Sequence, residues 1–378
     1  MTFLDRHRPA PTGFAKILYL HWPLILLLVA IAAIGCLMLI SVAGGTLDPW
    51  ARAQAIRFAL GLCVMGIVAM VHIRFWRSMA PIAYLGGLIL LVAVEFFGAV
   101  GMGAQRWIDL GVIRLQPSEV MKISLVMALA LYYDLIPANK VSHPLYLLPP
   151  VILTLVPVAL VLAQPDLGTA ILLGVSAAAV AFLAGVSLWY FAAAAGGASA
   201  LVTFVFQSRG TEWQILKDYQ YRRIETFLDP SLDPLGAGYH ITQSKIALGS
   251  GGISGRGFME GTQTRLNFLP EKHTDFIFTT LAEEFGFVGS ATLLTLYLLV
   301  VAFCALAAIT NRDRFSALLI GGIGVTFFSF FAVNMAMVMG LIPVVGVPLP
   351  LVSYGGSAML VLMGAFGLVQ SAYVHRPR

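Results

Sequence analysis

The sequence predicts an all-α polytopic membrane protein with about ten transmembrane helices and one large extracytoplasmic loop between the seventh and eighth spans. Of its 378 residues, 59% are hydrophobic and only 11% are charged, whereas soluble domains carry about 25% charged residues. Many apolar runs also reach the roughly 20 residues that an α-helix needs to cross the hydrocarbon core of a bilayer. We therefore treat residues 1–378 as a single integral-membrane domain.

The ten predicted spans follow from apolar length along the chain. They lie near 22–42, 53–72, 77–98, 117–134, 145–163, 167–184, 187–206, 276–308, 315–339 and 356–373. The first run is longer than the core of about 7–15 residues in a cleaved signal peptide, so we expect it to be retained. The eighth run is long enough to be tilted or only partly in lipid.

Basic residues in the short loops predict the orientation of the chain. They gather on the side that carries both termini, at Arg6, Arg8, Lys16, Arg74, Arg77, Lys140, Arg312, Arg314, Arg376 and Arg378. The short loops of the other side hold mainly Arg52, Arg106 and Arg114. We therefore expect cytoplasmic termini, and we place the loop 207–275 on the periplasmic or outer face. No G-x-x-x-x-G-K-[ST] loop and no nucleic-acid-binding motif is present, so chemistry on that face requires a substrate that carries its own activation.

The chain enters the eighth span directly after Glu271-Lys272-His273-Thr274-Asp275, which makes Asp275 the candidate catalytic residue. A helix N-cap is the alternative role for this aspartate, and the sequence leaves both open. Glu283 would lie about 12 Å farther along a helix. Paired carboxylates that flank one glycosidic bond are about 5–9.5 Å apart. We therefore expect Glu283 and Glu284 to make structural pairs.

Glu119 and Lys122 lie three residues apart in the fourth span, where a helix would bring them to one face. Ionisable residues inside a span commonly mark a functional site, although an ion pair that joins helices is the alternative. Arg106 and Asp166 belong to the same side of the membrane, and Asp166 also suits an N-cap of the sixth span.

We expect these four residues and Asp275 to converge on one cavity that opens outward. The segment Leu341–Leu360 holds three prolines and three glycines, so it cannot be one regular helix. Irregular backbone at membrane depth must be buried in protein or line a cavity. We therefore place this segment beside the same cavity.

The large loop combines basic and aliphatic side chains, which suit an anionic lipid headgroup at a membrane surface. Within it, residues Tyr239–Leu248 predict an amphipathic helix. Cys36, Cys63 and Cys304 each lie in an apolar run without metal-ligand spacing, so we expect small buried hydrophobes and predict no metal ligands.

Five strings in the chain resemble, in the same order, the SEDS (shape, elongation, division and sporulation) family. They are RWIDLGVIRLQPSEVMK at 106–122, QPDLGTA at 164–170, DPLGAGYHITQSKIALGSGGISGRGFMEGTQ at 233–263, LNFLPEKHTDFIFTTLAEEFGFVG at 266–289 and GLIPVVGVPLPLVSYGGSAML at 340–360. The resemblance covers nearly the whole chain. Phe268 and the short termini favour the elongation branch, which maintains rod shape, over the division branch.

The resemblance implies a peptidoglycan glycosyltransferase of the bacterial inner membrane that polymerises lipid II. The implied reaction joins the 4-hydroxyl of GlcNAc to C1 of MurNAc with inversion and releases the lipid pyrophosphate. Asp275 would be the general base, and Lys122 would contact the leaving pyrophosphate or Asp275. The remaining substrate-binding candidates are Glu119, Arg106, Asp166, Lys245, Gln263 and His273.

The resemblance implies no resident cofactor, although a divalent cation, Mg²⁺ or Mn²⁺, on the pyrophosphate is compatible with it. The implied partners are a class B penicillin-binding protein, which cross-links the strands, and other membrane proteins of the elongation complex. Two alternatives remain: a lipid II flippase, and a non-catalytic scaffold for the penicillin-binding protein. The absence of an evident inverted repeat and the crowding of charge at one face argue against a transporter.

Overall fold

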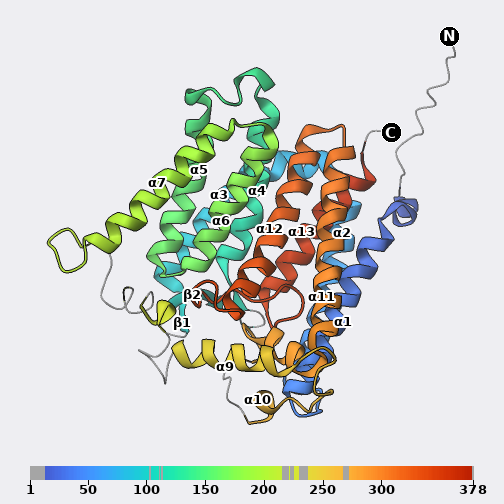
Figure 1. Ribbon diagram of the computed structural model, residues 1–378. Helices are drawn as coiled ribbons and strands as arrows, with labels where there is room; N and C mark the ends of the chain where they lie inside the picture. The colour runs from blue at the N-terminus through green and yellow to red at the C-terminus, as the bar shows by residue number, and fades with distance from the viewer. Residues whose placement is uncertain are drawn as a thin grey trace.

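A computed structural model describes residues 13–101, 104–109, 111, 114–214, 221, 225–229, 237–266 and 272–376. Within them, ten long helices form a bundle (Figure 1). They are α1 (Trp22–Val42), α2 (Ala51–Met70), α3 (Ile73–Phe97), α4 (Pro117–Leu135), α5 (Pro144–Ala163), α6 (Leu167–Ala184), α7 (Leu188–Gln207), α11 (Ile277–Thr310), α12 (Arg314–Val338) and α13 (Ser357–Val374).

Nine of these helices are long and apolar enough to cross a membrane. The tenth, α4, carries Glu119, Lys122 and Asp134 and is largely buried by its neighbours. Each predicted span is thus a helix within a few residues of its expected bounds. The shorter helical elements are η1 (Gly13–Tyr19), η2 (Ala138–Lys140), α9 (Ala237–Ser250) and α10 (Thr262–Arg265).

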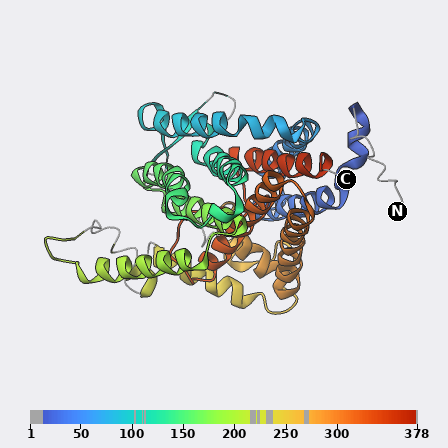
Figure 2. The ribbon, with the colours of Figure 1, turned by 90° about the horizontal axis from the view of Figure 1, so that it is seen from above.

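The interior of the bundle is formed by α4, α12 and α13, whereas α7 stands at its edge (Figure 2). The most apolar window is 72% buried in α12 and 67% buried in α13, against 0% in α7. Gly322 allows this interior to close, because a Cβ there would lie 2.6 Å from Val126 Cγ1 and 2.7 Å from Val180 Cγ2. The backbone of α12 is therefore approached closely by both α4 and α6.

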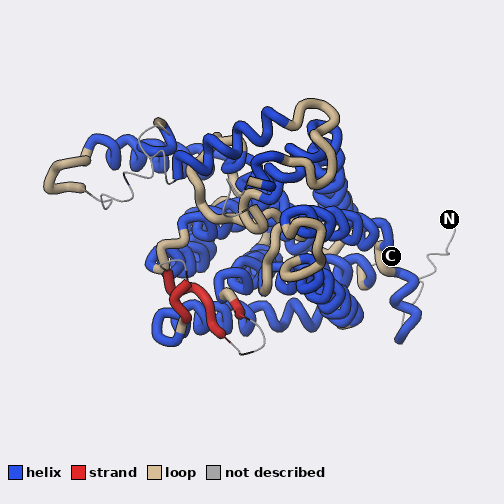
Figure 3. The backbone as a smooth tube through the Cα atoms, turned by 90° about the horizontal axis from the view of Figure 1, so that it is seen from below, coloured by secondary structure: helices blue, strands red, loops and turns tan. Residues whose placement is uncertain are grey.

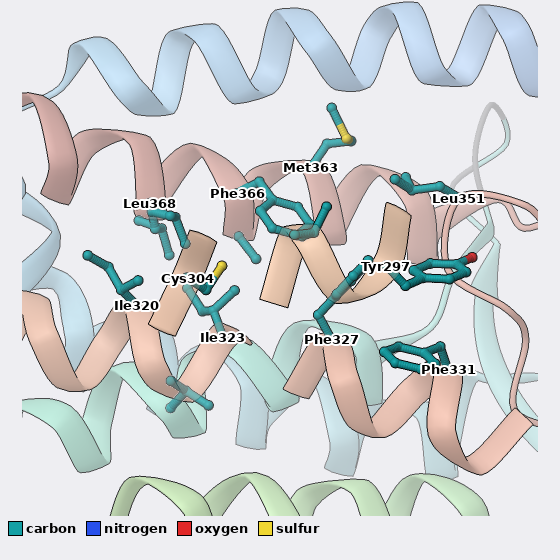
Figure 4. Close-up of a cluster of buried hydrophobic side chains, with 14 of the residues drawn as sticks. Tyr297, Cys304, Ile320, Ile323, Phe327, Phe331, Leu351, Met363, Phe366 and Leu368 are labelled. Atoms are coloured by element: carbon teal, nitrogen blue, oxygen red, sulfur yellow. The ribbon is translucent and has the colours of Figure 1, made fainter. Parts of the chain in front are cut away.

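Aromatic side chains tie α11, α12 and α13 together in the core (Figure 4). Tyr297 of α11 stacks on Phe331 of α12 with ring centroids 5.0 Å apart, and Phe327 meets Phe366 of α13 edge to face at 5.3 Å. The Tyr297 hydroxyl donates to Pro350 O at 2.6 Å. A buried phenol needs such an acceptor, so this bond fixes the segment after α12 to the core.

The segment between α12 and α13 is irregular, as its prolines and glycines predict. It folds back under the bundle at the end opposite the chain termini, which we call the outer end (Figure 1). Gly168, in the first turn of α6, lies directly against it, because a Cβ there would be 2.6 Å from Val345 O. Residues 347–353 are largely buried by protein, as irregular backbone at membrane depth requires, whereas Leu341 at the start of the segment is exposed.

The glycine-rich stretch before α10 docks on a kink in α11. Gly286 takes a left-handed backbone conformation (φ 63°, ψ −155°) and interrupts the helix. Arg256 N donates to Glu283 O and Gly257 N to Glu284 O, both at 3.0 Å. These bonds satisfy carbonyls that the kink leaves without helical partners. A long eighth span is therefore one bent helix anchored to the outer loop.

The amphipathic helix predicted near 239–248 is present as α9, which lies across the outer end (Figure 1). It buries Ile241, Ser244 and Ala247 at helical spacing. Ser244 Oγ donates to Val338 O at 2.7 Å and so satisfies one of the last carbonyls of α12.

A small antiparallel sheet departs from the all-α prediction within the described residues. Strands β1 (Ala99–Gly101), β2 (Ala104–Asp109) and β3 (Arg114–Leu115) pair in the order β1-β2-β3 at one edge of the outer end (Figure 3). The Asp109 carboxylate accepts from Gly111 N at 2.9 Å, which forms the turn after β2. The polar patch between the third and fourth spans is therefore a folded cap.

Candidate active site

Three consecutive carbonyls hold the turn that carries Asp275. Tyr354 N donates to His273 O at 2.9 Å, and Ser353 Oγ donates to Thr274 O at 2.6 Å. Asn334 Nδ2 donates to Asp275 O at 2.9 Å. All three donors belong to the end of α12 or to the irregular segment, so the turn is fastened to them at each residue.

The Asp275 side chain is half-buried, and it lies against the irregular segment. A Cβ at Gly346 would be 3.7 Å from Asp275 Oδ2, an ordinary van der Waals distance, so Gly346 lies beside the carboxylate. The N-cap position of α11 is occupied by Phe276 without a side-chain cap. The alternative in which Asp275 caps the eighth span is therefore not what the structure shows.

A narrow apolar cavity lies between α4, α12, α13 and residues 348–355. The charged residues of its wall are Glu119 and Lys122. Lys122 is 1% exposed, and its Nζ lies 2.7 Å from Glu119 Oε1 and 3.9 Å from the centroid of the Phe330 ring. The predicted pair is thus present, and the cavity carries a buried ammonium.

The cavity and the Asp275 turn are neighbours along α12. Phe330 contacts Lys122, and Asn334 lies four residues later, which is about 6 Å along a helix axis. Asn334 Nδ2 also donates to Val347 O at 2.7 Å. Lys122 forms an ion pair with Glu119. A contact of Lys122 with the leaving pyrophosphate or with Asp275 stays a prediction.

Arg106 and Asp166 lie on the same outer end but make structural contacts. Arg106 donates through Nε to Gln164 O at 3.0 Å and through Nη2 to Pro165 O. Asp166 caps α6, accepting from Thr169 N at 3.1 Å and from Thr169 Oγ1 at 2.9 Å. The N-cap alternative for Asp166 is thus confirmed, and substrate binding by these two residues stays a prediction.

The loop candidates lie around the same end of the bundle. His273 stacks on Trp50, with ring centroids 4.7 Å apart and planes at 15°. Just before it, burial lowers the pKa of the Lys272 ammonium. Lys245 is exposed on α9 and lies over the turn after α12, since a Cβ at Gly340 would meet its Cε at 2.5 Å. Gln263 belongs to α10, and its side chain lies outside the described part of the structure.

The residues that position Asp275 were missed by the sequence analysis. Asn334 and Gln54 are fully buried amides inside apolar runs, and Arg57 is a charge inside the second span. A polar group at membrane depth is a signal of function or of a necessary hydrogen bond, and that signal was available here. The described residues contain no cluster of three or more His, Cys, Asp or Glu side chains that suits a metal ion.

Known proteins resemble this chain over nearly its whole length. The model of the family of cell cycle proteins that includes FtsW, RodA and SpoVE matches residues 21–377. The peptidoglycan glycosyltransferase MrdB of Escherichia coli K12 is 43% identical over 97% of this chain and 97% of its own. A probable peptidoglycan glycosyltransferase FtsW of Escherichia coli O6:H1 is 39% identical over 89% of this chain and 81% of its own.

Solved structures give the same result. One chain in a peptidoglycan synthase complex, solved to explain the coordination of polymerization and crosslinking, matches with a TM-score of 0.80 and 31% identity, covering 94% of this chain and 97% of that one. The rod shape-determining protein RodA of Thermus thermophilus matches with a TM-score of 0.68 and 27% identity, covering 95% of this chain and 98% of that one.

Proposed function

Because the chain belongs to the FtsW, RodA and SpoVE family, we propose that it is a peptidoglycan glycosyltransferase that polymerises lipid II, with Asp275 as the general base. One observation carries the site assignment. The carbonyls of His273, Thr274 and Asp275 accept hydrogen bonds from Tyr354, Ser353 and Asn334, and Ser353 also lines the cavity that holds a buried ammonium. An aspartate held in this way, half-buried beside a cavity, suits proton transfer in a defined geometry.

Similarity assigns the chain to the elongation branch. It is 43% identical to MrdB over 97% of its length, against 39% to FtsW over 89%, and RodA structures share its fold. The prediction of a SEDS glycosyltransferase of the elongation branch is thereby confirmed.

The proposed mechanism uses the residues of the site in separate roles. The Asp275 carboxylate accepts the proton of the GlcNAc 4-hydroxyl as that oxygen bonds to C1 of the neighbouring MurNAc. The bond from C1 to the pyrophosphate breaks on the opposite side of the sugar, which inverts C1 and releases the lipid pyrophosphate. Lys122 places positive charge where the leaving group gains negative charge, and such preorganised charge lowers the barrier.

The pyrophosphate itself supplies the activation, so the reaction needs no nucleotide. Our proposal includes a divalent cation, Mg²⁺ or Mn²⁺, bound chiefly by pyrophosphate oxygens, because such ions commonly bind substrate phosphates with few protein ligands.

The proposed setting is the bacterial inner membrane, with both termini in the cytoplasm and Asp275 facing the periplasm. The excess of basic residues on the termini side supports this orientation. A class B penicillin-binding protein is the proposed partner. The likeness to a chain of a peptidoglycan synthase complex supports such an assembly, and other membrane proteins of the elongation complex would join it.

The test is polymerisation of labelled lipid II by the purified protein with its partner in detergent. Asp275→Asn removes the base with little change in shape, and we expect the rate of glycan formation to fall by about 10²–10⁴-fold. Asp109→Asn is the matched control. Asp109 is exposed and bonds to Arg114 at 3.2 Å, and exposed pairs of this kind contribute little, so the control should polymerise at the parental rate.

The alternative functions give different results in the same assay. If the protein is a flippase or a scaffold, the parent makes no polymer with a transpeptidase alone. When a second polymerase is added, the parent and Asp275→Asn then give equal amounts of polymer. Lipid II binding that persists in Asp275→Asn while polymer is lost supports the catalytic assignment. Unchanged polymerisation by that variant refutes it.

A further inference from the structure

Arg57 lies inside the second span on a face that is polar for two turns. One helix face, at the spacing i, i+4 and i+7, carries Trp50 at the start of α2, then Gln54 and Arg57. Gln54 and Arg57 face the turn 349–354. Trp50 faces His273, which that turn holds through Tyr354 N. Gln54 Nε2 donates to Ser353 O at 2.9 Å, and Trp50 stacks on His273.

The Arg57 guanidinium has an unsatisfied position. Its central carbon lies 4.7 Å from the centroid of the Tyr354 ring, while Nη1 is buried and has no hydrogen-bond partner in the part of the chain that the structure describes. Among the described residues, the ion pairs of the structure involve other cations, and none includes Arg57. A guanidinium stays charged in a protein, and a buried donor without an acceptor is costly. The site therefore lacks an acceptor oxygen that a ligand can supply.

The position of Arg57 is fixed relative to Asp275. Gln54, one turn away on the same face, holds Ser353 O, and Ser353 Oγ in turn holds Thr274 O. Tyr354, under the guanidinium, donates its N–H to His273 O. Leu351 and Ser353 also line the cavity that contains Lys122. One turn of backbone thus adjoins Asp275, Lys122 and Arg57.

We propose that Arg57 binds a phosphate of a lipid-linked substrate at a position separate from Lys122. The inference rests on the proposed function, which joins two lipid-linked pyrophosphates and therefore brings two anionic groups to the site. Lys122 is already paired with Glu119, whereas Arg57 forms no ion pair with a carboxylate of the described residues. Guanidinium groups bind phosphate oxygens through two parallel hydrogen bonds.

The depth of Arg57 suits a lipid phosphate. It lies six residues after Ala51, the first residue of α2, which is about 9 Å along the helix axis. A helix of 20 residues spans about 30 Å, so Arg57 lies in the outer third of the span rather than at the bilayer centre. Headgroup phosphates lie just outside the hydrocarbon core, and arginine side chains near the end of a span are long enough to reach that level.

The test measures binding rather than turnover. The full chain in complex with its transpeptidase partner is titrated with undecaprenyl pyrophosphate and with undecaprenol by native mass spectrometry. We expect Arg57→Gln to raise Kd for the pyrophosphate by about 10–100-fold, the effect of losing charge-assisted hydrogen bonds, and to leave Kd for undecaprenol within about twofold. Arg57→Lys keeps the positive charge but loses the paired donors of the guanidinium, so its Kd for the pyrophosphate should lie between those of the parent and of Arg57→Gln.

Arg52→Gln is the matched control, because Arg52 is exposed on the same helix and should leave both constants unchanged. An unchanged Kd for the pyrophosphate in Arg57→Gln overturns the proposal, and so does an equal loss for both lipids, which indicates a structural role. Phosphatidylglycerol that competes as well as undecaprenyl pyrophosphate also overturns it, since the site would then bind any anionic headgroup. A parent protein that binds the pyrophosphate in an Arg57-dependent way but makes no polymer refutes the proposed function and leaves this site standing.

Discussion

The two ends of the bundle differ in how the first turns of their helices are capped. At the end that carries the chain termini, His21, His72 and His143 begin α1, α3 and α5, and the Nδ1 atom of each accepts from a backbone N–H of the first turn. Asp313 caps α12 in the same way, and only α7 of the five helices starting there lacks a side-chain cap.

At the outer end, α2, α4, α11 and α13 all start without a side-chain cap. Of the five long helices described as starting at this end, α6 alone has a side-chain cap, which Asp166 provides. Caps contribute about 0.5–2 kcal/mol each, so most helices that start at the termini end gain a local stabilisation that most helices starting at the outer end lack. Hydrogen bonds between distant segments occur at both ends, for example from Ser371 Oγ to Val71 O at the termini end. At the outer end, bonds of this kind from Asn334 and Ser353 hold the turn that carries Asp275. The site therefore depends on the assembled fold, and the following variants test this.

Asn334→Ala should have the largest effect. It removes the donor that holds both Asp275 O and Val347 O, so the turn is released from α12. We expect the unfolding free energy to fall by about 1–3 kcal/mol. The polymerisation rate should fall by about 100-fold, because a misplacement of about 1 Å can have that effect on a reaction. Lipid II polymerisation and thermal unfolding in detergent measure the two quantities.

Ser329→Ala is the control on the same helix, since Ser329 bonds only within α12, to Val325 O at 2.8 Å. Ser329→Ala should change neither the unfolding free energy nor the polymerisation rate by a large factor. Full polymerisation by Asn334→Ala would mean that the long-range bonds of the outer end serve stability alone.

Glu284 tests whether the outer end also contains purely structural carboxylates. It is 1% exposed and accepts from Ser41 Oγ of α1. Glu284→Ala should reduce the unfolding free energy by about 1–3 kcal/mol because the buried Ser41 hydroxyl loses its partner. The rate per folded molecule should stay within about twofold, since we place no step of the reaction at Glu284.

A double-mutant cycle with Ser41→Ala isolates the pair, and its coupling free energy should be about 0.5–3 kcal/mol. A rate loss in Glu284→Ala comparable to that of Asp275→Asn would move Glu284 into the chemistry and contradict the assignment of roles.

The smallest effect belongs to the termini end and concerns stability alone. His72 and His375 pack with ring centroids 4.4 Å apart at the ends of α3 and α13. Burial lowers the pKa of both imidazoles, and the positive charge of Lys16 lowers each further, with Arg74 also acting on His72. The folded protein therefore binds these protons less readily than the unfolded chain.

This lowering of the pKa determines how the stability of the folded protein depends on pH. The contribution to stability is complete above about pH 6.5, the ordinary pKa of histidine, and is lost as the pH falls below it. We expect the melting temperature in detergent to drop between about pH 7.5 and 5.5, and His375→Gln to reduce that drop. An unaltered pH dependence in His375→Gln would show that other groups control it.

Hydropathy was sufficient to predict the ten long helices, nine of which are apolar enough to cross a membrane, because a chain in lipid must satisfy its backbone within helices. The Glu119–Lys122 pair was equally predictable, because three residues on a helix define a contact. The donors to the Asp275 turn were not, since Asn334 and Ser353 lie 59 and 79 residues from the carbonyls that they hold. No local period encodes such a distance. The strands β1–β3 were not predicted, because the residues around them resemble those of an ordinary polar loop.

The three carbonyl bonds of the Asp275 turn have a mechanical consequence. Each of its residues from His273 to Asp275 is hydrogen-bonded to α12 or to the irregular segment. A displacement of Asn334 or Ser353 would therefore also move the backbone that carries Asp275.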